Sequence, residues 1–450
     1  MRMKPLINIF RITAMMMVIF VLTGCQAENG EKDTPITNEL GEQSAIHFIV
    51  ASDLHVLAES IFDSGEAFGA FSSTSNGVVI PLTEQLFKLF ALEMIEKKPD
   101  FLVLTGDLTV NGERASHKAI ASTLSEIEQA GIEVYVIPGN HDINNPWARA
   151  FEGDAQIITP NVSEKDFAEI YKNFGYGISE RAPNDLSYYV PLNDTIGMYF
   201  IDTNNYKNNR SLGYPVAGSF VEEDTIAWLE ALRDAHKDER ALAFMHHNLL
   251  RHSSMFQEGY VSDKASRLKS IFSKDQVAFA SSGHLHIQDV TRDEKAFEVV
   301  NYALGVYPHL YGEYTLDGDV LTYTVSQQKV SEMAKQTNWA DDALKHYDTF
   351  GPDFYKTVNR RMIKRFKDQL EIDEKEATIL FETFLAINQN FTNGKETESE
   401  AYLATDAYAT LTQSEGFMSK YLLTIVTDNP VDDHNFRLNL KTGQLLSPSD

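Results

Sequence analysis

Five short apolar stretches in this chain are each followed at once by residue types that commonly bind metal ions. Their length and β-branched content predict buried strands, and helical patterns at residues 84–97, 113–129 and 222–236 lie between several of them. Alternating strands and helices predict a layered α/β domain whose loops gather at one edge of a sheet. The stretches and the residues that follow them are 46–52 before Asp53-Leu54-His55, 101–105 before Gly106-Asp107, 133–138 before Gly139-Asn140-His141-Asp142, 241–245 before His246-His247, and 277–282 before Gly283-His284-Leu285-His286.

The spacing of the acidic and histidine residues within these loops suits metal binding. In an extended backbone, residues i and i+2 point to the same side, so Asp53 and His55 can reach one ion. For the same reason His284 and His286 can reach a common centre. Each fragment alone is more often an ordinary loop, a turn or a buried histidine than a ligand. Because five fragments follow five strands, all of these ordinary explanations would have to coincide, and the series therefore favours a metal site.

The first residues of the chain are typical of a secretory signal. Three basic residues precede the uncharged run 14–22, which is shorter than the ~20 residues needed to span a bilayer. The run ends in Leu22-Thr23-Gly24-Cys25, which resembles a bacterial lipobox, whose cysteine is acylated and becomes the first mature residue. We therefore expect a signal peptide at 1–24, a lipidated Cys25, a flexible tether over 25–44, and an extracytoplasmic protein anchored to the bacterial cell membrane. Because Cys25 is the only cysteine, disulfides are excluded.

The charge of the chain limits its partners. The formal net charge is −26 at pH 7, and so acidic a protein is poorly suited to neutralising the phosphates of a long nucleic acid. A small phosphorylated substrate remains compatible with this charge, because a bound metal ion inverts the local potential. The 450 residues suffice for a sizeable core and favour two domains over one.

Taken together and in this order, the five motifs resemble the full signature of the calcineurin-like metallophosphoesterases. The resemblance covers roughly residues 45–325. Within the family, the sequence is most similar to bacterial phosphodiesterases of the cyclic-nucleotide type, in which Gly106-Asp107-Leu108-Thr109 is continued by a pair like Gly112-Glu113. The motifs, none of which is missing, are Asp53-x-His55, Gly106-Asp107, Gly139-Asn140-His141-Asp142, His246 and Gly283-His284-x-His286.

The resemblance implies a four-layer αββα sandwich and a pair of transition-metal ions. Carboxylates and imidazoles without a thiolate suit Mn²⁺ or Fe, with Zn²⁺ as a further option, and the sequence does not choose among them. The same resemblance prefers His246 to His247, because the family's ligand directly follows the strand, although a slip of one residue would swap the two faces. By analogy one ion is held by Asp53, His55 and His286, the other by Asn140, His246 and His284, and Asp107 bridges the two.

The resemblance also implies a hydrolytic mechanism. Two ions ~3.5–4 Å apart lower the pKa of a shared water, and the resulting hydroxide attacks phosphorus in line. His141 occupies the family position on the leaving-group side, as an acid or an oxygen stabiliser, and Asp142 is expected to orient it by accepting its other N–H. Asn111 and His252 are weaker candidates for substrate contacts, for which ordinary loop solvation is the alternative.

The pattern of the sequence changes after about residue 328. Apolar residues recur at helical spacing over 354–370 and 380–391, and a third helix is predicted from about residue 400. We therefore expect a catalytic domain at 45–328 and a small, mainly helical C-terminal domain at 329–450. A basic cluster at 360–367 contrasts with the acidic chain; a solvated helix face is its ordinary explanation, and contact with a membrane or with substrate phosphate is the alternative.

These features together predict a dinuclear metal-dependent phosphodiesterase that hydrolyses small phosphodiesters, above all cyclic or other nucleotides. The same metal centre would also serve a phosphomonoesterase or a hydrolase of phospholipid head groups, because the shape of the pocket decides the substrate. A hypothesis of another class is a solute-binding envelope lipoprotein on a degenerate fold, and the complete set of ligands argues against it. The sequence leaves the oligomeric state open.

Overall fold

The computed structural model describes residues 45–177, 179–274, 276–413, 416–427 and 431–447 of the chain. The predicted signal peptide, the predicted lipidation site Cys25 and the tether lie outside the described residues. Within the described ranges, we find no helix whose length and apolar character would carry it across a bilayer.

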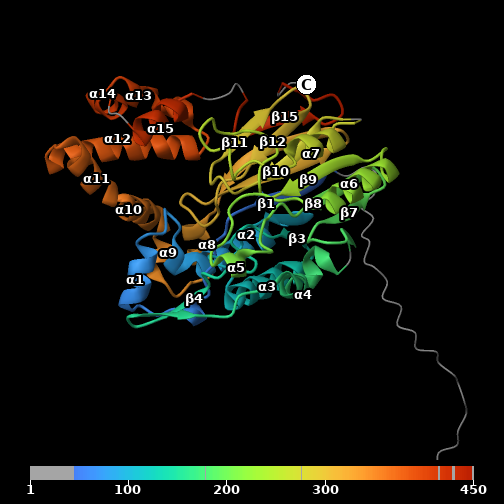
Figure 1. The fold of residues 1–450 in the computed structure, drawn as a ribbon, viewed down its shortest axis with the longest axis horizontal. Helices are drawn as coiled ribbons and strands as arrows, with labels where there is room; N and C mark the ends of the chain where they lie inside the picture. Colours follow the sequence, from blue (N-terminus) through green and yellow to red (C-terminus); the bar gives the residue numbers. More distant parts are fainter. Residues whose placement is uncertain (1–44, 178, 275, 414–415, 428–430, 448–450) are drawn as a thin grey trace, which may run out of the picture. The chain divides into compact units, whose positions relative to one another are not determined.

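Two mixed β-sheets form the body of the described chain (Figure 1). The first has the strand order β16-β15-β14-β13-β1-β2-β3, with β1 Ile46–Ala51, β2 Phe101–Thr105, β3 Glu133–Ile137, β13 Leu310–Asp317, β14 Val320–Gln327, β15 Asn435–Asn439 and β16 Gln444–Leu445. The second has the order β11-β12-β10-β9-β8-β7-β6, with β6 Glu180–Arg181, β7 Tyr188–Asn193, β8 Ile196–Ile201, β9 Arg240–Met245, β10 Ala278–Ser282, β11 Asp289–Arg292 and β12 Ala296–Val300. A separate hairpin joins β4 Arg149–Glu152 to β5 Ala155–Ile158.

The central strands are apolar because both of their faces are covered. Strands β1, β2 and β3 run parallel to one another, and every residue of β2 is buried. Aromatic side chains join the two sheets: the ring centroids of Phe48 and Phe244 lie 6.3 Å apart, and those of Phe279 and Tyr314 lie 6.2 Å apart. The sheets therefore pack face to face over one continuous hydrophobic core.

Helices cover the outer faces of both sheets. Helices α2 (Thr83–Lys97) and α3 (Arg114–Gln129) pack buried apolar residues against the first sheet. Helices α6 (Glu223–Ala235) and α7 (Ala265–Phe272) do the same on the second sheet. The predicted αββα sandwich is therefore confirmed. Shorter helices in this part of the chain are α1 Glu66–Ser72, α4 Glu164–Ile170 and α5 Asn209–Leu212.

The segment after β14 is helical, as the apolar periodicity predicts. Its longest helix, α12, places Phe381, Phe384 and Ile387 in a cluster that also holds Ile287 and Tyr302 of the second sheet and its loops. The chain then returns to the first sheet, because β15 pairs with β14, so the end of the predicted helical segment belongs to that sheet. The helices are α8 Val330–Gln336, α9 Asp342–Lys345, α10 Tyr347–Asn359, α11 Arg361–Leu370, α12 Glu374–Thr392, α13 Glu400–Leu403, α14 Asp406–Gln413 and α15 Phe417–Ile425.

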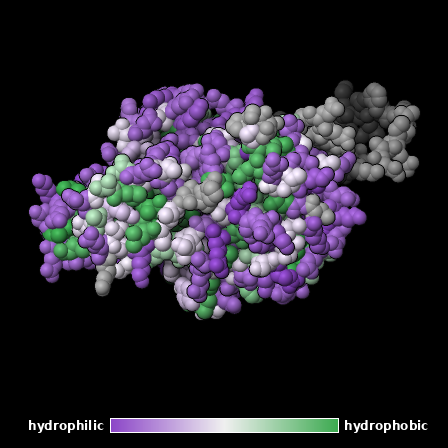
Figure 2. All heavy atoms as spheres, turned by 90° about the horizontal axis from the view of Figure 1, so that it is seen from above, coloured by the Kyte–Doolittle hydropathy of each residue, from purple (hydrophilic) through white to green (hydrophobic). Residues whose placement is uncertain are grey.

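The basic cluster at 360–367 lies on and just before α11. The apolar face of this helix, which includes the buried Phe366, packs against the cluster formed with α12, and the basic side chains are exposed. Arg361 donates a hydrogen bond of 2.6 Å to the side-chain oxygen of Asn76. The cluster is therefore the solvated face of an amphipathic helix. The face of the molecule that is drawn in Figure 2 is mostly hydrophilic.

Candidate metal centre

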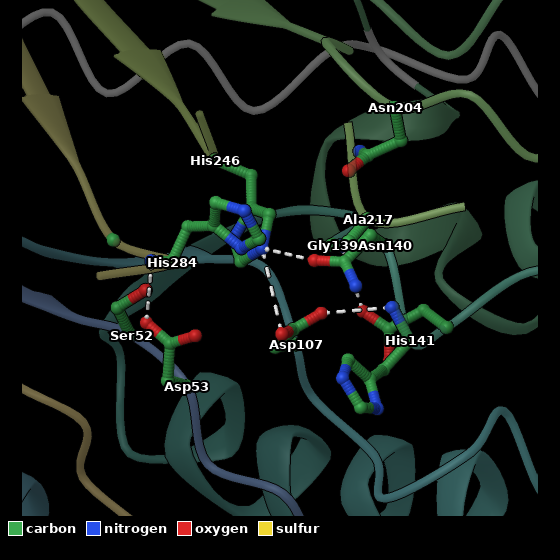
Figure 3. Close-up of polar contacts among 12 residues, drawn as sticks. Ser52, Asp53, Asp107, Gly139, Asn140, His141, Asn204, Ala217, His246 and His284 are labelled. Carbon is green, nitrogen blue, oxygen red and sulfur yellow. Dashed lines mark hydrogen bonds and ion pairs between the residues drawn. The ribbon is translucent and has the colours of Figure 1, made fainter. Parts of the chain in front are cut away.

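The acidic and histidine residues predicted as ligands meet at the carboxyl ends of five strands. Asp53 and His55 follow β1, Asp107 follows β2, Asn140 follows β3, and the remaining histidines follow β9 and β10. Parallel strands bring their carboxyl ends to one edge of a sheet, and the two packed sheets bring two such edges together. Figure 3 shows the side chains of Asp107, Asn140, His246 and His284 pointing toward one another from these loops.

The side chains form two overlapping groups that could each hold a cation. Ligand atoms within each group all lie within 4.8 Å of one another, and Asp107 belongs to both groups. The side-chain oxygen of Asn140 lies 3.1 Å from Nε2 of His246, which places Asn140 beside the second group. The grouping agrees with the division implied by the sequence: it consists of Asp53, His55, Asp107 and His286, and of Asp107, His246 and His284.

The geometry of the first group fits a cation. The Nε2 atoms of His55 and His286 face each other at 3.0 Å, and Nε2 of His286 lies 3.3 Å from Oδ1 of Asp53. This Oδ1 is buried and makes no hydrogen bond. A buried carboxylate oxygen without a donor carries a cost of desolvation that a bound cation would offset. Oxygen and imidazole donors together fit a transition-metal ion of the predicted kind.

Backbone carbonyls orient the histidines of the second group. His246 donates from Nδ1 to the carbonyl oxygen of Thr105 at 2.9 Å, which leaves Nε2 facing Asp107 Oδ2 at 3.5 Å. His284 donates from Nε2 to the carbonyl oxygen of Gly259 at 3.0 Å, which leaves Nδ1 free. A carbonyl can only accept, so each contact fixes the tautomer and presents a lone pair on the other nitrogen, as metal-binding histidines require.

The backbone of the predicted ligands is strained. Five of them adopt a positive φ, which is uncommon for residues other than glycine. Left-handed backbone of this kind costs on the order of 1–3 kcal/mol per residue and persists where the surrounding structure imposes it, commonly at functional sites. The residues and angles are Asp53 at 53°, His55 at 46°, Asp107 at 48°, His284 at 70° and His286 at 55°.

Two glycines let the loops approach closely enough to assemble the cluster. A Cβ atom on Gly139 would lie 2.1 Å from the backbone nitrogen of Asp107. A Cβ atom on Gly283 would lie 1.9 Å from Oγ of Ser52 and 2.5 Å from Oδ2 of Asp53. Both glycines are therefore required by contact between loops that come from different strands.

The carboxylates and histidines of the cluster shift one another's pKa values. Burial alone would raise the pKa of Asp107, but His246 and His141 outweigh it and hold that pKa well below its usual value. Burial lowers the pKa of His55 to about 3 and that of His284 to about 3, so both rings are neutral near pH 7. Burial would also lower the pKa of His246, but Asp107 outweighs it and raises that pKa to about 9. A cation would therefore displace a proton from His246, whereas the charged carboxylate and the two neutral rings can donate lone pairs directly.

His141 lies at the edge of the cluster, but Asp142 does not orient it. Nδ1 of His141 donates to the carbonyl oxygen of Val110 at 2.6 Å, and the backbone N–H of His141 donates to Oδ1 of Asp107 at 2.9 Å. The prediction for Asp142 is wrong, because its carboxylate is directed away from this ring. It accepts instead from the backbone N–H groups of Leu108, Thr109 and Gly139 and from the hydroxyl of Thr109, and so ties the β2 loop to the β3 loop.

The structure gives His252 a structural position in place of the predicted substrate contact. Its imidazole is fully buried; Nδ1 bonds to Asp289, and Nε2 lies 3.1 Å from Oε2 of Glu298. Both nitrogens are occupied by carboxylates of the protein, so the prediction that His252 lines the rim is wrong. Asn111, the other predicted contact, is nearly buried, and its side-chain oxygen accepts from Asn145 at 3.4 Å.

His247, the alternative to His246, has both ring nitrogens engaged away from the cluster. Nδ1 lies 2.9 Å from the hydroxyl oxygen of Thr203, and Nε2 donates to the carbonyl oxygen of Ala217 at 2.8 Å. The structure therefore places His246, not His247, beside Asp107.

Two residues that support the loops of the cluster were not predicted from the sequence. Glu298 of β12 accepts from the backbone N–H groups of Leu249 and Leu250 and from the hydroxyl of Ser282, which joins the β9 loop to the end of β10. Asn248 donates to the carbonyl oxygen of Gly283 at 3.0 Å. These residues hold the loops that carry His246 and His284. A buried glutamate inside an apolar strand was the available sequence signal for Glu298, and Asn248 offered none beyond its place after His247.

Asp202, at the end of β8, supports the β3 loop through Asn204. Oδ1 of Asp202 accepts from the side-chain amide of Asn204 at 2.9 Å, and the same amide donates to the carbonyl oxygen of Pro138 at 2.7 Å. Burial and, next, the neighbouring carboxylate of Asp185 raise the pKa of Asp202 to about 7 from its ordinary value of 3.8. The carboxyl group therefore takes up a proton more readily in the folded protein than in the unfolded chain.

This raised pKa predicts a pH-dependent contribution to stability. Asp202 favours folding fully below pH 3.8 and loses this contribution as the pH rises through about 7. Asp202→Asn cannot ionise, so between pH 4.5 and pH 8 its free energy of unfolding should fall less than that of the wild type, by roughly 3 kcal/mol. Urea unfolding of the metal-free proteins between pH 4.5 and pH 8 measures the difference, and parallel pH profiles would contradict the assignment.

Both the sandwich and the C-terminal helical segment match known protein families. Residues 46–288 match the family described as calcineurin-like phosphoesterase, a stretch that is more than half of the chain and includes all five motifs. Residues 329–432 match the C-terminal domain of cyclic nucleotide phosphodiesterase.

Individual relatives are distant. The probable glycerophosphodiester phosphodiesterase GpdQ of Arcobacter nitrofigilis is 25% identical over 194 residues, which are 43% of this chain and 58% of that protein. Among solved structures, a dimetal phosphatase from Danio rerio has a TM-score of 0.47 at 14% identity, with 63% of this chain and 96% of that chain covered. The GAP50 anchor of the inner membrane complex of Plasmodium has a TM-score of 0.35 at 11% identity, with 63% and 85% covered.

Proposed function

Because the chain belongs to the calcineurin-like phosphoesterase family, we propose that it is a metal-dependent phosphodiesterase that hydrolyses small phosphodiesters, above all cyclic or other nucleotides. The observation that carries this proposal is the pair of side-chain groups that share Asp107. The match of residues 329–432 to the C-terminal domain of cyclic nucleotide phosphodiesterase supports a nucleotide. The Arcobacter relative, a probable glycerophosphodiester phosphodiesterase, supports a diester.

In this proposal the residues of the cluster would divide between two ions. Bound there, a pair of transition-metal ions would supply Lewis acidity, which polarises phosphoryl oxygens and lowers the pKa of water. The protein contributes the fixed orientation of the donors, because carbonyl oxygens and backbone N–H groups hold the side chains in place. The ions would be held by Asp53, His55 and His286, by Asn140, His246 and His284, and by Asp107 between them.

We assign His141 the role of proton donor to the departing oxygen. Because Nδ1 already donates to Val110, the ring presents Nε2 toward the cluster, where it packs edge-on against His55 with ring centroids 5.2 Å apart. In the protonated ring, Nε2–H can pass its proton to the leaving alkoxide, which is a general-acid role. The backbone bond from His141 to Asp107 keeps this donor at a fixed position relative to the cluster.

The proposal is tested with metal-free protein and with protein reloaded with Mn²⁺. Hydrolysis is measured on 2′,3′-cyclic and 3′,5′-cyclic nucleotides, a dinucleotide, a glycerophosphodiester and a phosphomonoester. We expect no turnover after chelation, restored turnover with Mn²⁺, and the highest kcat/KM on a nucleotide diester. Preference for the monoester would replace the diesterase with a phosphatase. Tight binding of a nucleotide with no turnover under any metal would favour the solute-binding alternative.

A further inference from the structure

A row of aromatic side chains leads from the metal cluster to the C-terminal helices. The ring of Tyr260 lies 5.0 Å from the ring of His284, between centroids. The ring of Phe256 lies 5.6 Å from that of Tyr260, and the ring of Phe417, at the start of α15, lies 6.4 Å from that of Phe256. The row therefore connects a predicted metal ligand with a helix more than 130 positions further along the chain.

These rings lie at the border of the core: Phe256 packs against the hydrophobic cluster of the C-terminal helices, yet each ring keeps part of its surface in solvent. Tyr260 and Phe256 are partly exposed, and Phe417 is 54% exposed. The cluster itself is open at the same time, since the side chain of His286 is 33% exposed. Adjacent exposed aromatic surface beside an accessible polar cluster is typical of a ligand site, in which polar groups fix one end of the ligand and apolar groups hold the other.

The loop that carries Tyr260 is held firmly against the cluster. The carbonyl oxygen of Gly259 accepts the Nε2 hydrogen of His284 at 3.0 Å. The backbone N–H of Asn248 donates to the carbonyl oxygen of Tyr260 at 2.9 Å, which joins this loop to the loop after β9. Tyr260 therefore has a defined position relative to the ions that the cluster would hold, and a ligand pays little to order it.

The chemistry of the metal cluster and of the adjacent aromatic row indicates which ligand would bind across both. A phosphodiester bound by the cluster must direct one of its ester groups along the neighbouring surface, and the first aromatic side chain of that surface is Tyr260, tilted at 41° to the ring of His284. Nucleobases stack on aromatic side chains whatever their sequence, because every base has a π-face. A glycerol ester has no flat ring and gains little from such a surface.

We propose that Tyr260, Phe256 and Phe417 form a stacking surface for the nucleobase of the substrate while its phosphate lies at the metal cluster. The inference rests on the proposed function and assigns the C-terminal helices a part in substrate binding through α15. It makes the aromatic row the feature that favours nucleotide esters over glycerol esters.

The test measures the contribution of the base by itself. The Mn²⁺-loaded protein hydrolyses methyl p-nitrophenyl phosphate in the assay, and the inhibition constants of AMP and of ribose 5-phosphate are measured as competitive inhibitors. The two inhibitors share a phosphate and a ribose and differ in the base. We expect the wild type to bind AMP roughly tenfold more tightly than ribose 5-phosphate. In Phe417→Ala and in Tyr260→Ala, the ratio of the two inhibition constants should move toward one.

Leu423→Ala is the matched control, because Leu423 lies on the same helix, is 53% exposed and has no aromatic ring. It should keep the wild-type ratio. Metal content is measured for every variant, because loss of an ion after Tyr260→Ala would lower both affinities without changing their ratio. Equal inhibition of the wild type by AMP and ribose 5-phosphate, or an unchanged ratio in Phe417→Ala, would overturn the inference and leave the proposed function standing. Absence of hydrolysis would instead remove the proposed function, and calorimetry with AMP and ribose 5-phosphate would then still decide the stacking surface.

Discussion

Asp107→Asn should lower kcat for phosphodiester hydrolysis by about a thousandfold or more. Asp107 is the one side chain shared by both ligand groups, and its Oδ2 lies 3.5 Å from Nε2 of His246 and 4.0 Å from Nε2 of His55. An amide has the same size but no negative charge, and its NH₂ group would point toward a cation or an imidazole lone pair. The substitution therefore removes the charge that would hold two cations side by side, while the loop around it remains packed.

The measurement combines kcat on a nucleotide diester with metal content per protein and thermal unfolding. We expect the variant to fold and to bind less metal than the wild type. Asp234→Asn is the matched control, since Asp234 is 69% exposed, pairs with Lys274 and lies on α6 away from the cluster. Undiminished turnover in Asp107→Asn would refute the two-ion arrangement, and unfolding of the variant would move the test to Asp107→Glu.

His141→Ala should have an effect that depends on the leaving group. With a 3′,5′-cyclic nucleotide or another alkyl ester, the departing oxygen needs a proton, and loss of a general acid should cost about 10²–10⁴ in kcat. With a p-nitrophenyl ester, the leaving group is stable as an anion, so the loss should be far smaller. The substitution should leave the metal ligands in place, because the ring of His141 packs edge-on against His55 and belongs to neither ligand group.

The comparison of the two substrates separates a proton donor from a structural residue. Each variant is measured on an alkyl ester and on a p-nitrophenyl ester at several pH values, with metal content recorded. His141→Gln is the companion variant, because it keeps a polar side chain without the acid. Equal losses on both esters would show that His141 positions the cluster or the substrate and does not donate a proton.

Local patterns in the sequence were enough to predict the five strands that precede the cluster, the helices α2, α3 and α6, and the cluster of metal-binding residue types. The predicted helix at 84–97 corresponds to α2 at Thr83–Lys97, and the predicted helix at 113–129 corresponds to α3 at Arg114–Gln129. Both follow from apolar periodicity, which acts over a few residues. The metal cluster was predictable because the residue that follows each parallel strand lies at the same edge of its sheet.

The partners of individual polar side chains did not follow from the sequence. Asp142 is next to His141 in the chain, yet three backbone N–H groups of neighbouring loops occupy its carboxylate. His252 follows a predicted ligand closely, yet it turns inward to Glu298, which lies on β12. A buried charge is stable only where donors surround it, and those donors come from segments far away in the sequence.

By itself, therefore, the sequence determined which residues follow each strand. It also determined that carboxylates and imidazoles would gather there, because both properties depend on the order of residues within each strand and loop. Only the tertiary structure decided which of them face one another, that β15 returns to the first sheet, and that Phe417 of α15 lies within reach of Phe256 and, through Tyr260, of His284. The physical reason is that such contacts depend on how two sheets and a set of helices pack together, which no local pattern records.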